Sequence, residues 1–215
     1  MIDVREYNDR EGRSPYAAWF NRLNAQAAAK VATALTRLAQ GNFSNVKGVG
    51  SRVFECRIDF GPGYRVYFGK DGERLVILLG GGTRSTSSTI STQPLPAGRI
   101  TNGESRRTTM ALTRDFKETI RARAVRDPKF RKELLREGVE CMLAGDTATA
   151  KTILRDYINA TVGFAEVAEA THIPSKSLMR MLGPAGNPRA DNLFEIVTFL
   201  QQREGVRFHV KSAPA

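Results

Sequence analysis

The sequence predicts an α+β protein with two domains, residues 1–83 and residues 110–215, joined by a disordered linker over residues 84–109. Three observations lead to this prediction. In the first domain apolar residues alternate, as they do in half-buried strands. In the second they recur at helical spacing, as in amphipathic helices that bury one face. Between the two, Ser, Thr, Pro and Gly dominate without any period, which is typical of a flexible linker.

The first domain begins with a strand and a helical hairpin. Apolar residues alternate over residues 2–7, which predicts a short strand. Ser14 followed by Pro15 is a helix-start signal, because Ser caps the first turn and Pro fits the first helical position. Apolar residues at helical spacing then continue to Gly41, and Asn24 marks a break between two helices.

An antiparallel meander of three strands completes the first domain. After a polar loop, apolar residues alternate over residues 52–60, and Gly61-Pro62-Gly63 forms a turn. Asp71-Gly72 is a strong hairpin signal, and the apolar run that follows over residues 74–81 reads as a central strand. The predicted order of elements is therefore β-α-α-β-β-β.

The second domain is predicted to consist of five or six helices, with no strand signal until its last few residues. Thr113 or Asp115 can start the first helix. Asp127 followed by Pro128 repeats the pattern of a cap and a proline, and Asp146 can cap the third helix. Each of these helices has one apolar stripe, so we expect them to enclose a common core.

Residues 164–182 fit the requirements of a helix-turn-helix. Ala168 is the small residue where two helices cross, and Val167 and Leu178 are apolar at the inner positions. His172 stands in the turn, where Gly is usual because the turn favours a positive φ. An ordinary helix pair within a bundle is the alternative interpretation.

The second helix of this motif and the start of the next helix carry the residues expected to bind DNA. Ser and Arg near the start of a recognition helix suit base edges, and cations or helix N-termini suit phosphates. The predicted DNA-binding residues are Ser175, Lys176, Ser177, Arg180, Arg189 and Asn192.

The net charge of +11 is spread over both domains, which indicates polyanionic partners such as nucleic acid. A generally basic protein without such a partner is the alternative. No apolar run is long enough to span a membrane and the first residues are too charged for a signal peptide, so we expect a cytoplasmic protein. Cys56 and Cys141 are expected to be reduced and buried. No metal-ligand spacing and no phosphate-binding glycine loop occurs, so neither a metal nor a cofactor is expected.

The predicted meander gathers cations and phenols. RNA can be cleaved without a metal when a base activates its own 2′-hydroxyl, cations stabilise the phosphorane and an acid protonates the leaving oxygen. An Arg, Lys and Tyr set can supply these groups, although a solvated basic face would have the same composition. The candidate catalytic residues are Lys47, Arg57, Tyr64, Arg65 and Tyr67, with Arg52 and Lys70 as candidate RNA-binding residues.

Two families of bacterial proteins share motifs with this chain. Residues 1–83, with the run E-C-R-I-D-F-G-P-G-Y-R-V-Y, resemble the RelE/ParE superfamily of toxins, in the HigB-related branch of addiction module killer proteins. Residues 110–210 resemble the HigA-like addiction module antidote proteins with a helix-turn-helix. The resemblance implies a toxin that cleaves mRNA on the ribosome and an antitoxin that binds the toxin and represses its own operon.

This resemblance predicts a fused toxin–antitoxin module and assigns the cationic residues of the meander to the toxin site. Toxins of the family continue into a basic C-terminal helix, which is missing here, and Met110 stands where a separate antitoxin would start. A frameshift near residue 84 is our hypothesis for this junction, and ribonuclease activity is expected to be weak or absent. Residues 112–145 are the predicted toxin-covering surface, in cis or in trans, and a homodimer is expected.

Two other functions remain open at this point. The chain can be a plain transcriptional repressor whose first domain is an inert toxin remnant. Gyrase inhibition, the activity of other toxins in the superfamily, is the third possibility.

Overall fold

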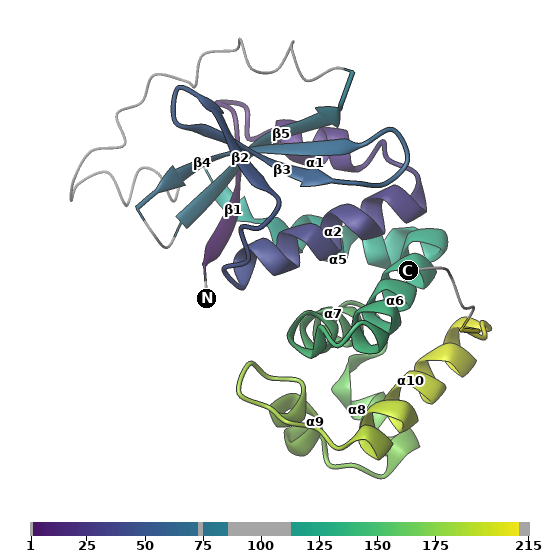
Figure 1. Ribbon diagram of the computed structural model, residues 1–215. Coiled ribbons are helices and arrows are strands. Elements are labelled where there is room, and N and C mark those ends of the chain that lie inside the picture. Colours follow the sequence, from purple (N-terminus) through teal and green to yellow (C-terminus); the bar gives the residue numbers. More distant parts are fainter. Residues whose placement is uncertain (1, 73–74, 86–112, 211–215) are drawn as a thin grey trace. The chain divides into compact units, whose positions relative to one another are not determined.

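The computed structural model describes residues 2–72, 75–85 and 113–210. They form two compact units, residues 1–123 and residues 124–215, called unit 1 and unit 2 below. The described residues contain eight helices and one sheet of six strands (Figure 1), which confirms the mixed α and β class. None of these helices is long and apolar enough to cross a membrane.

Unit 1 consists of the sheet and its helices. Its strands are β1 (Asp3–Tyr7), β2 (Val46–Gly50), β3 (Val53–Ile58), β4 (Tyr64–Asp71), β5 (Leu75–Thr83) and β6 (Thr113–Asp115). Its helices are α1 (Pro15–Phe20), α2 (Ala25–Ala39) and most of α5 (Phe116–Arg126). The strand order is β2-β3-β4-β5-β1-β6, and only the β1–β5 pair is parallel.

Side chains cap the two helices of the predicted hairpin. The Ser14 hydroxyl accepts a hydrogen bond from the Ala17 amide at 3.0 Å, and Pro15 is the first residue of α1. The Asn24 side chain accepts from the Ala27 amide at 2.8 Å, so it starts α2. The break predicted at Asn24 is therefore confirmed, because its side chain satisfies an amide that the helix itself leaves unpaired.

The helices of unit 1 pack on the sheet through large buried side chains. α1 lies against β5, whereas α2 contacts β1 and β3. Trp19 of α1 lies directly over Gly81 of β5, and a Cβ atom at Gly81 would come within 2.3 Å of the indole ring. The largest wholly buried side chains include Tyr16, Phe20, Leu35, Leu38, Phe68 and Leu78.

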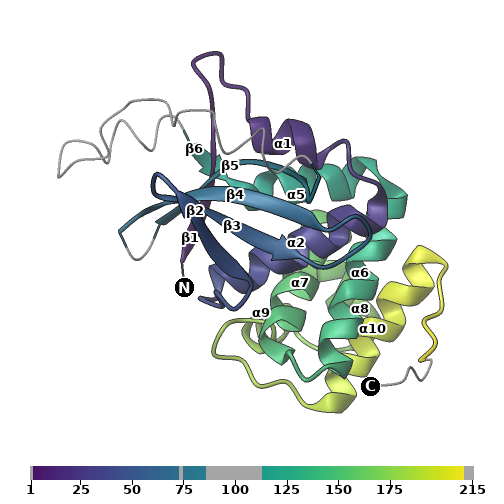
Figure 2. The same cartoon turned by 45° about the horizontal axis from the view of Figure 1, so that its top comes forward.

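Two strands were missed by the sequence analysis. β2 forms in the region assigned to a polar loop, because Val46 and Lys47 pair with Cys56 and Glu55 of β3. β6 forms near the start of the region predicted to be all-α, because it pairs with β1 (Figure 2). Both strands depend on a partner strand rather than on their own pattern, since β2 is half-exposed and β6 has only three residues.

The first compact unit extends further along the chain than the predicted first domain. Residues 113–123 belong to unit 1, although the sequence placed them in the helical domain. α5 begins at Phe116, and the Asp115 carboxylate accepts from the Lys117 amide at 2.9 Å. Residues 86–112, which hold almost all of the predicted linker and Met110, lie outside the described residues.

Two non-glycine residues of the β2–β3 turn have a left-handed backbone conformation. Ser51 has a φ of 48° and Arg52 a φ of 61°. Because Gly adopts this conformation without the Cβ penalty of about 1 to 2 kcal/mol, we expect Ser51→Gly to raise the free energy of unfolding by about 0.5 to 1 kcal/mol in urea denaturation. Ser44→Gly is the control at an exposed position with a negative φ, and it should lower that free energy. A loss at both positions would contradict the prediction.

Unit 2 consists of helices around one core. They are α6 (Pro128–Leu143), α7 (Thr147–Ala160), α8 (Gly163–Thr171), α9 (Ser175–Met181) and α10 (Ala190–Glu204). The predicted caps are present, because Asp127 accepts from the Phe130 amide at 3.1 Å and Asp146 from the Thr149 amide at 3.2 Å. Leu135, Leu154, Tyr157, Val167 and Leu200 are among the core residues.

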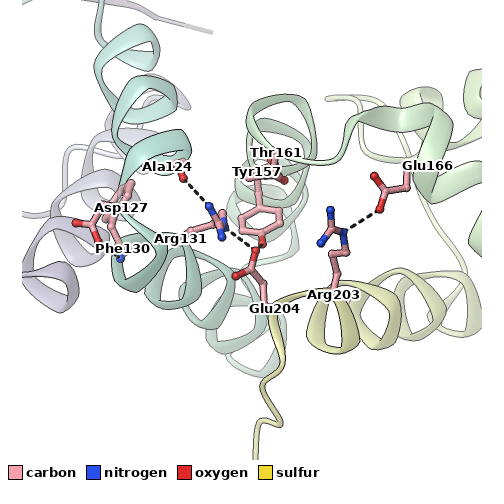
Figure 3. A network of polar contacts seen from close by, with 9 residues as sticks. All are labelled: Ala124, Asp127, Phe130, Arg131, Tyr157, Thr161, Glu166, Arg203 and Glu204. Atoms are coloured by element: carbon pink, nitrogen blue, oxygen red, sulfur yellow. Dashed lines mark hydrogen bonds and ion pairs between the residues drawn. The ribbon is translucent and has the colours of Figure 1, made fainter.

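A buried polar network ties α10 to α6 and α7 (Figure 3). The Glu204 carboxylate accepts from Arg131 Nε and from the Tyr157 hydroxyl, both at 2.6 Å. Arg131 also donates to the Ala124 carbonyl at 3.3 Å. Burial, together with the hydrogen bond to Glu204, raises the pKa of Tyr157 well above its usual range. Glu204 therefore links three helices through two charge-assisted hydrogen bonds.

Candidate nucleic-acid interfaces

The residues predicted to form a helix-turn-helix make up two helices, α8 and α9, with a short turn between them. His172 follows α8 with φ 55° and ψ 19°, which is the left-handed conformation that the turn requires. Val167 and Leu178 are buried at the inner positions predicted for them, and Phe164 of α8 is buried as well. His172 thus takes the conformation for which Gly is more usual.

Some side chains of α9 face solvent, whereas others contact the preceding helix α8. Lys176 and Arg180 are exposed, and Ser177 is half-buried. Ser175 has a different role, because its hydroxyl donates to the Phe164 carbonyl of α8 at 3.2 Å. The outward cations of α9 are therefore Lys176 and Arg180, which can reach an anionic or base-edge acceptor.

The two residues predicted at the start of α10 differ in exposure. Arg189 is exposed and forms a solvent-facing ion pair with Asp191 at 3.4 Å. Asn192 is half-buried, and its side-chain amide points to the sulfur of Met181 at 3.2 Å. Arg189 is available for a phosphate, whereas Asn192 connects α10 to the end of α9.

Two cations of α7 that the sequence analysis did not predict bind the end of α9 and the segment after it. Arg155 donates to the Met179 carbonyl at 2.7 Å, and Lys151 donates to the Gly186 carbonyl at 2.5 Å. Cations near the last carbonyls of a helix are favourable because the helix dipole is negative there. Their spacing of four residues on α7 was visible in the sequence, but their partners depend on tertiary packing.

The sheet of unit 1 brings four of the candidate catalytic residues to one face. Arg57 of β3 is directly opposite Arg65 of β4, and Tyr67 is opposite Glu55, which is itself opposite Lys47 of β2. Directly opposite residues, and residues two apart in one strand, share a face. Lys47, Arg57, Arg65 and Tyr67 therefore lie on the same side of the sheet, called the cationic face below.

Glu55 lies between the two arginines of the cationic face and was not predicted as a site residue. Its carboxylate is 2.7 Å from Arg57 Nε and 3.7 Å from Arg65 Nε. The Glu55 side chain is 8% exposed, Arg65 is 11% exposed and Arg57 is 40% exposed. A carboxylate held beside two guanidinium groups offers a proton acceptor next to cations that can stabilise a phosphorane. The alternation of Glu55 and Arg57 in β3 was the sequence signal for this pair.

Tyr64 and Lys70 do not share the cationic face. Tyr64 alternates with Arg65 in β4, and its ring meets Trp19 of α1 edge-on, with the centroids 6.4 Å apart. Lys70 Nζ lies over the Phe43 ring at 4.0 Å and near the Phe54 ring at 4.8 Å. These cation–π contacts give Lys70 partners on the other side of the sheet.

The end of the cationic face nearest the β3–β4 turn is hollowed. A recess of about 260 Å³ is lined by residues 59–63, Arg65 and Arg84. The Arg84 amide donates to the Gly63 carbonyl at 2.8 Å, which holds the residue after β5 beside the turn. Two guanidinium groups at one recess can bind a phosphate. Arg52, also predicted to bind RNA, is exposed in the β2–β3 turn.

Comparison with known proteins identifies a relative for part of the chain. A Haemophilus influenzae protein, named only as an uncharacterized protein, is 46% identical over 72 residues, which are 33% of this chain and 73% of that protein. No family model matches the chain. No solved structure matches it either.

Proposed function

The chain belongs to the same family as this Haemophilus influenzae protein, and we propose that it is a toxin–antitoxin module in a single polypeptide. The proposal is supported by the presence of two features in one chain. The first is a helix pair of the helix-turn-helix type with exposed Lys176 and Arg180. The second is a sheet face on which the Glu55 carboxylate lies between Arg57 and Arg65. The first feature suits DNA and the second suits RNA cleavage. Operator DNA and translated mRNA are both cytoplasmic partners, so a cytoplasmic location is part of this proposal.

The proposed DNA reader is α9. A recognition helix enters the major groove, where an arginine can bond to the O6 and N7 atoms of guanine. Arg180 is the exposed arginine of α9, and Arg189 lies nearby in sequence at the start of α10, where a phosphate contact is favourable. Helix-turn-helix proteins commonly read palindromic sites as dimers, so we propose a homodimer on the operator.

Substituting Arg180 tests the DNA-binding half. We expect Arg180→Ala to weaken binding to the DNA upstream of the protein's own gene by about 1 to 3 kcal/mol, because one base contact is lost. The measurement is a gel-shift titration at fixed salt. Arg13→Ala, which removes an exposed arginine of unit 1, is the matched control and should bind normally. Equal binding by the Arg180 variant and the wild type would show that α9 does not read the operator.

The proposed cleavage reaction uses the ribose 2′-hydroxyl as nucleophile. Glu55 accepts the 2′-hydroxyl proton, the 2′-oxygen attacks the adjacent phosphorus, and the bond to the 5′-oxygen breaks. Arg57 and Arg65 stabilise the negative charge of the phosphorane, and Lys47 on the same face protonates the leaving oxygen. The products are a 2′,3′-cyclic phosphate and a 5′-hydroxyl. The substrate is mRNA on the ribosome, and the antidote part of the chain restrains this activity.

Substituting Arg65 tests the RNA-cleaving half. We expect residues 1–123, the compact unit, to cleave mRNA weakly in a translation extract, and Arg65→Ala to reduce that cleavage about 100-fold because a phosphorane-stabilising cation is lost. Arg22→Ala, at an exposed arginine after α1, is the control and should cleave normally. Primer extension on the mRNA measures the cleavage.

A plain DNA-binding repressor is the second candidate function. It is favoured by the contacts of Glu55 with both Arg57 and Arg65, since these neutralise part of the cationic face internally. The same translation extract separates the two candidates. If residues 1–123 cleave no mRNA while the full chain binds its operator, the sheet unit is an inert remnant and the repressor remains.

A further inference from the structure

Residues 113–123, called the docking segment below, are bound to residues 5–23 of the same compact unit. β6 of the segment pairs with β1 in antiparallel register, with Arg5 opposite Asp115 and Tyr7 opposite Thr113. The Arg5 side chain also donates to the Thr113 hydroxyl at 2.9 Å. The segment therefore adds a strand at the edge of β1, which is a common way for an extended peptide to bind a protein.

An ion pair joins two residues that lie directly opposite each other in this strand pair, with the Arg114 side chain 38% exposed. The Glu6 side chain has no exposed surface, and Arg114 Nε of the docking segment lies 3.0 Å from its carboxylate. Arg114 also donates to the Thr119 hydroxyl at 2.9 Å, which fixes the guanidinium against the start of α5. Burial raises the pKa of Glu6, although hydrogen bonds from Thr119 and Ser14 and the charge of Arg114 oppose the rise. A carboxylate at this depth requires a cationic partner, and the segment supplies it.

A second arginine closes the other end of the docking segment. Arg123 is buried, and its guanidinium donates to the Phe20 carbonyl at 2.5 Å and to the Leu23 carbonyl at 2.6 Å. The same group lies 5.3 Å from the centroid of the Phe20 ring. Phe20 is the last residue of α1 and Leu23 lies just after it, so Arg123 places its positive charge at the negative end of the helix. Between the two arginines, Phe116 and Ile120 are buried.

We propose that residues 113–123 are the segment by which the antidote part of the chain binds the RNA-cleaving unit, and that its receptor is the β1 edge, Glu6 and the carbonyls of Phe20 and Leu23. The assignment of the segment to the antidote rests on the proposed function. The partner that fits the receptor is a short strand followed by a helix, with one arginine for Glu6 and another for the end of α1.

The receptor is separate from the cationic face. In the strand order, β5 and β1 lie between β4, which carries Arg65, and β6 of the docking segment. The segment therefore anchors the antidote without occupying the proposed site of RNA cleavage.

Cleavage of the folded full-length chain between residues 86 and 112 tests the proposal. A protease recognition sequence inserted there is cut after purification, and the association of the two pieces is measured by size-exclusion chromatography and titration. We expect the wild-type pieces to co-elute, and Arg114→Ala and Arg123→Ala each to raise their dissociation constant by about tenfold or more. Glu118→Ala, at an exposed position of the same helix, is the control and should leave the constant unchanged.

A second measurement does not depend on the folding of the variants. An excess of a peptide with residues 110–126 should displace the helical piece from the cut wild-type complex, and the same peptide with both arginines replaced by alanine should not. Separation of the wild-type pieces without a competitor would overturn the proposal. Equal association of the pieces in the wild type and in the double arginine variant would also overturn it.

Failure of this proposal is distinguishable from failure of the proposed function. If the pieces associate through Arg114 and Arg123 but residues 1–123 cleave no mRNA, the docking segment stands and the toxin activity is refuted. If mRNA is cleaved and the arginine variants associate normally, the toxin activity stands and the docking segment is refuted.

Discussion

Replacing Glu204 with alanine is expected to lower the free energy of unfolding of unit 2 by about 2 to 4 kcal/mol. The substitution removes the acceptor shared by Arg131 and Tyr157, each 2.6 Å from the same carboxylate oxygen (Figure 3). The Glu204 side chain is 6% exposed. Because water has little access there, it cannot fully replace the hydrogen bonds that Arg131 and Tyr157 lose. The loss is smaller than for a wholly buried pair, because the Arg131 side chain is 24% exposed and can be partly hydrated.

The ion pair between Arg203 of α10 and Glu166 of α8 offers a control, because Arg203 is adjacent to Glu204. Its nitrogen–oxygen distance is 2.9 Å, but the two side chains are 57% and 42% exposed. We expect Glu166→Ala to lower the free energy of unfolding by less than about 1 kcal/mol, since exposed ion pairs contribute little. Urea denaturation followed by far-ultraviolet circular dichroism measures both variants. Equal losses at Glu204 and Glu166 would refute a structural role for the buried network.

The second large effect is expected at Gly81. Gly81→Ala places a methyl group within 2.3 Å of Cε3 and 2.4 Å of Cδ2 of the Trp19 ring, far inside van der Waals contact. Either the indole leaves its position between Tyr16 and Tyr64, or α1 moves away from β5. We expect the free energy of unfolding of unit 1 to fall by about 3 kcal/mol, as for an overpacked core. Because Trp19 is the single tryptophan, its fluorescence during urea denaturation measures the change.

The neighbouring Gly80 separates this steric effect from a general effect of replacing glycine in β5. Among the residues that the structure describes, a Cβ atom at Gly80 meets no atom within 4 Å. Gly80→Ala should therefore change the free energy of unfolding by less than about 1 kcal/mol, and in the stabilising direction if alanine lowers the entropy of the unfolded chain. If the two variants lose the same stability, the contact of Trp19 with Gly81 does not limit packing.

The helix starts could be predicted from the sequence because they depend on neighbouring residues. Each N-cap side chain accepts a hydrogen bond from the backbone amide three residues later in the sequence. These caps are Ser14, Asn24, Asp127 and Asp146. The two missed strands, β2 and β6, depend instead on pairing. β6 pairs with residues about a hundred positions earlier in the chain, and no local pattern reveals such a partner.

The candidate sites could be predicted only where they depend on residues that are close in the sequence. Arg57 and Arg65 flank one turn, so their direct pairing in the sheet could be anticipated. Tyr64 was grouped with them, although strand alternation places it on the other face. Glu55 could not be predicted as a site residue, because its role becomes visible only when both arginines are located around it. The partners of Arg155 could not be predicted because they are backbone carbonyls brought near by tertiary packing.

The position of β1 has a consequence for the order in which the protein folds during synthesis. β1 is made first, yet its two neighbours in the sheet are residues 75–78 and residues 113–115. At about 5 to 20 residues per second, the ribosome needs several seconds or more to supply both neighbours, whereas β2 to β5 can pair as soon as each hairpin is made. Both edges of β1 are open until residue 78 emerges, and one edge stays open to pairing with another nascent chain until residue 115 emerges. The emergence of residue 115 from the ribosome is therefore the moment at which the first strand becomes protected from aggregation.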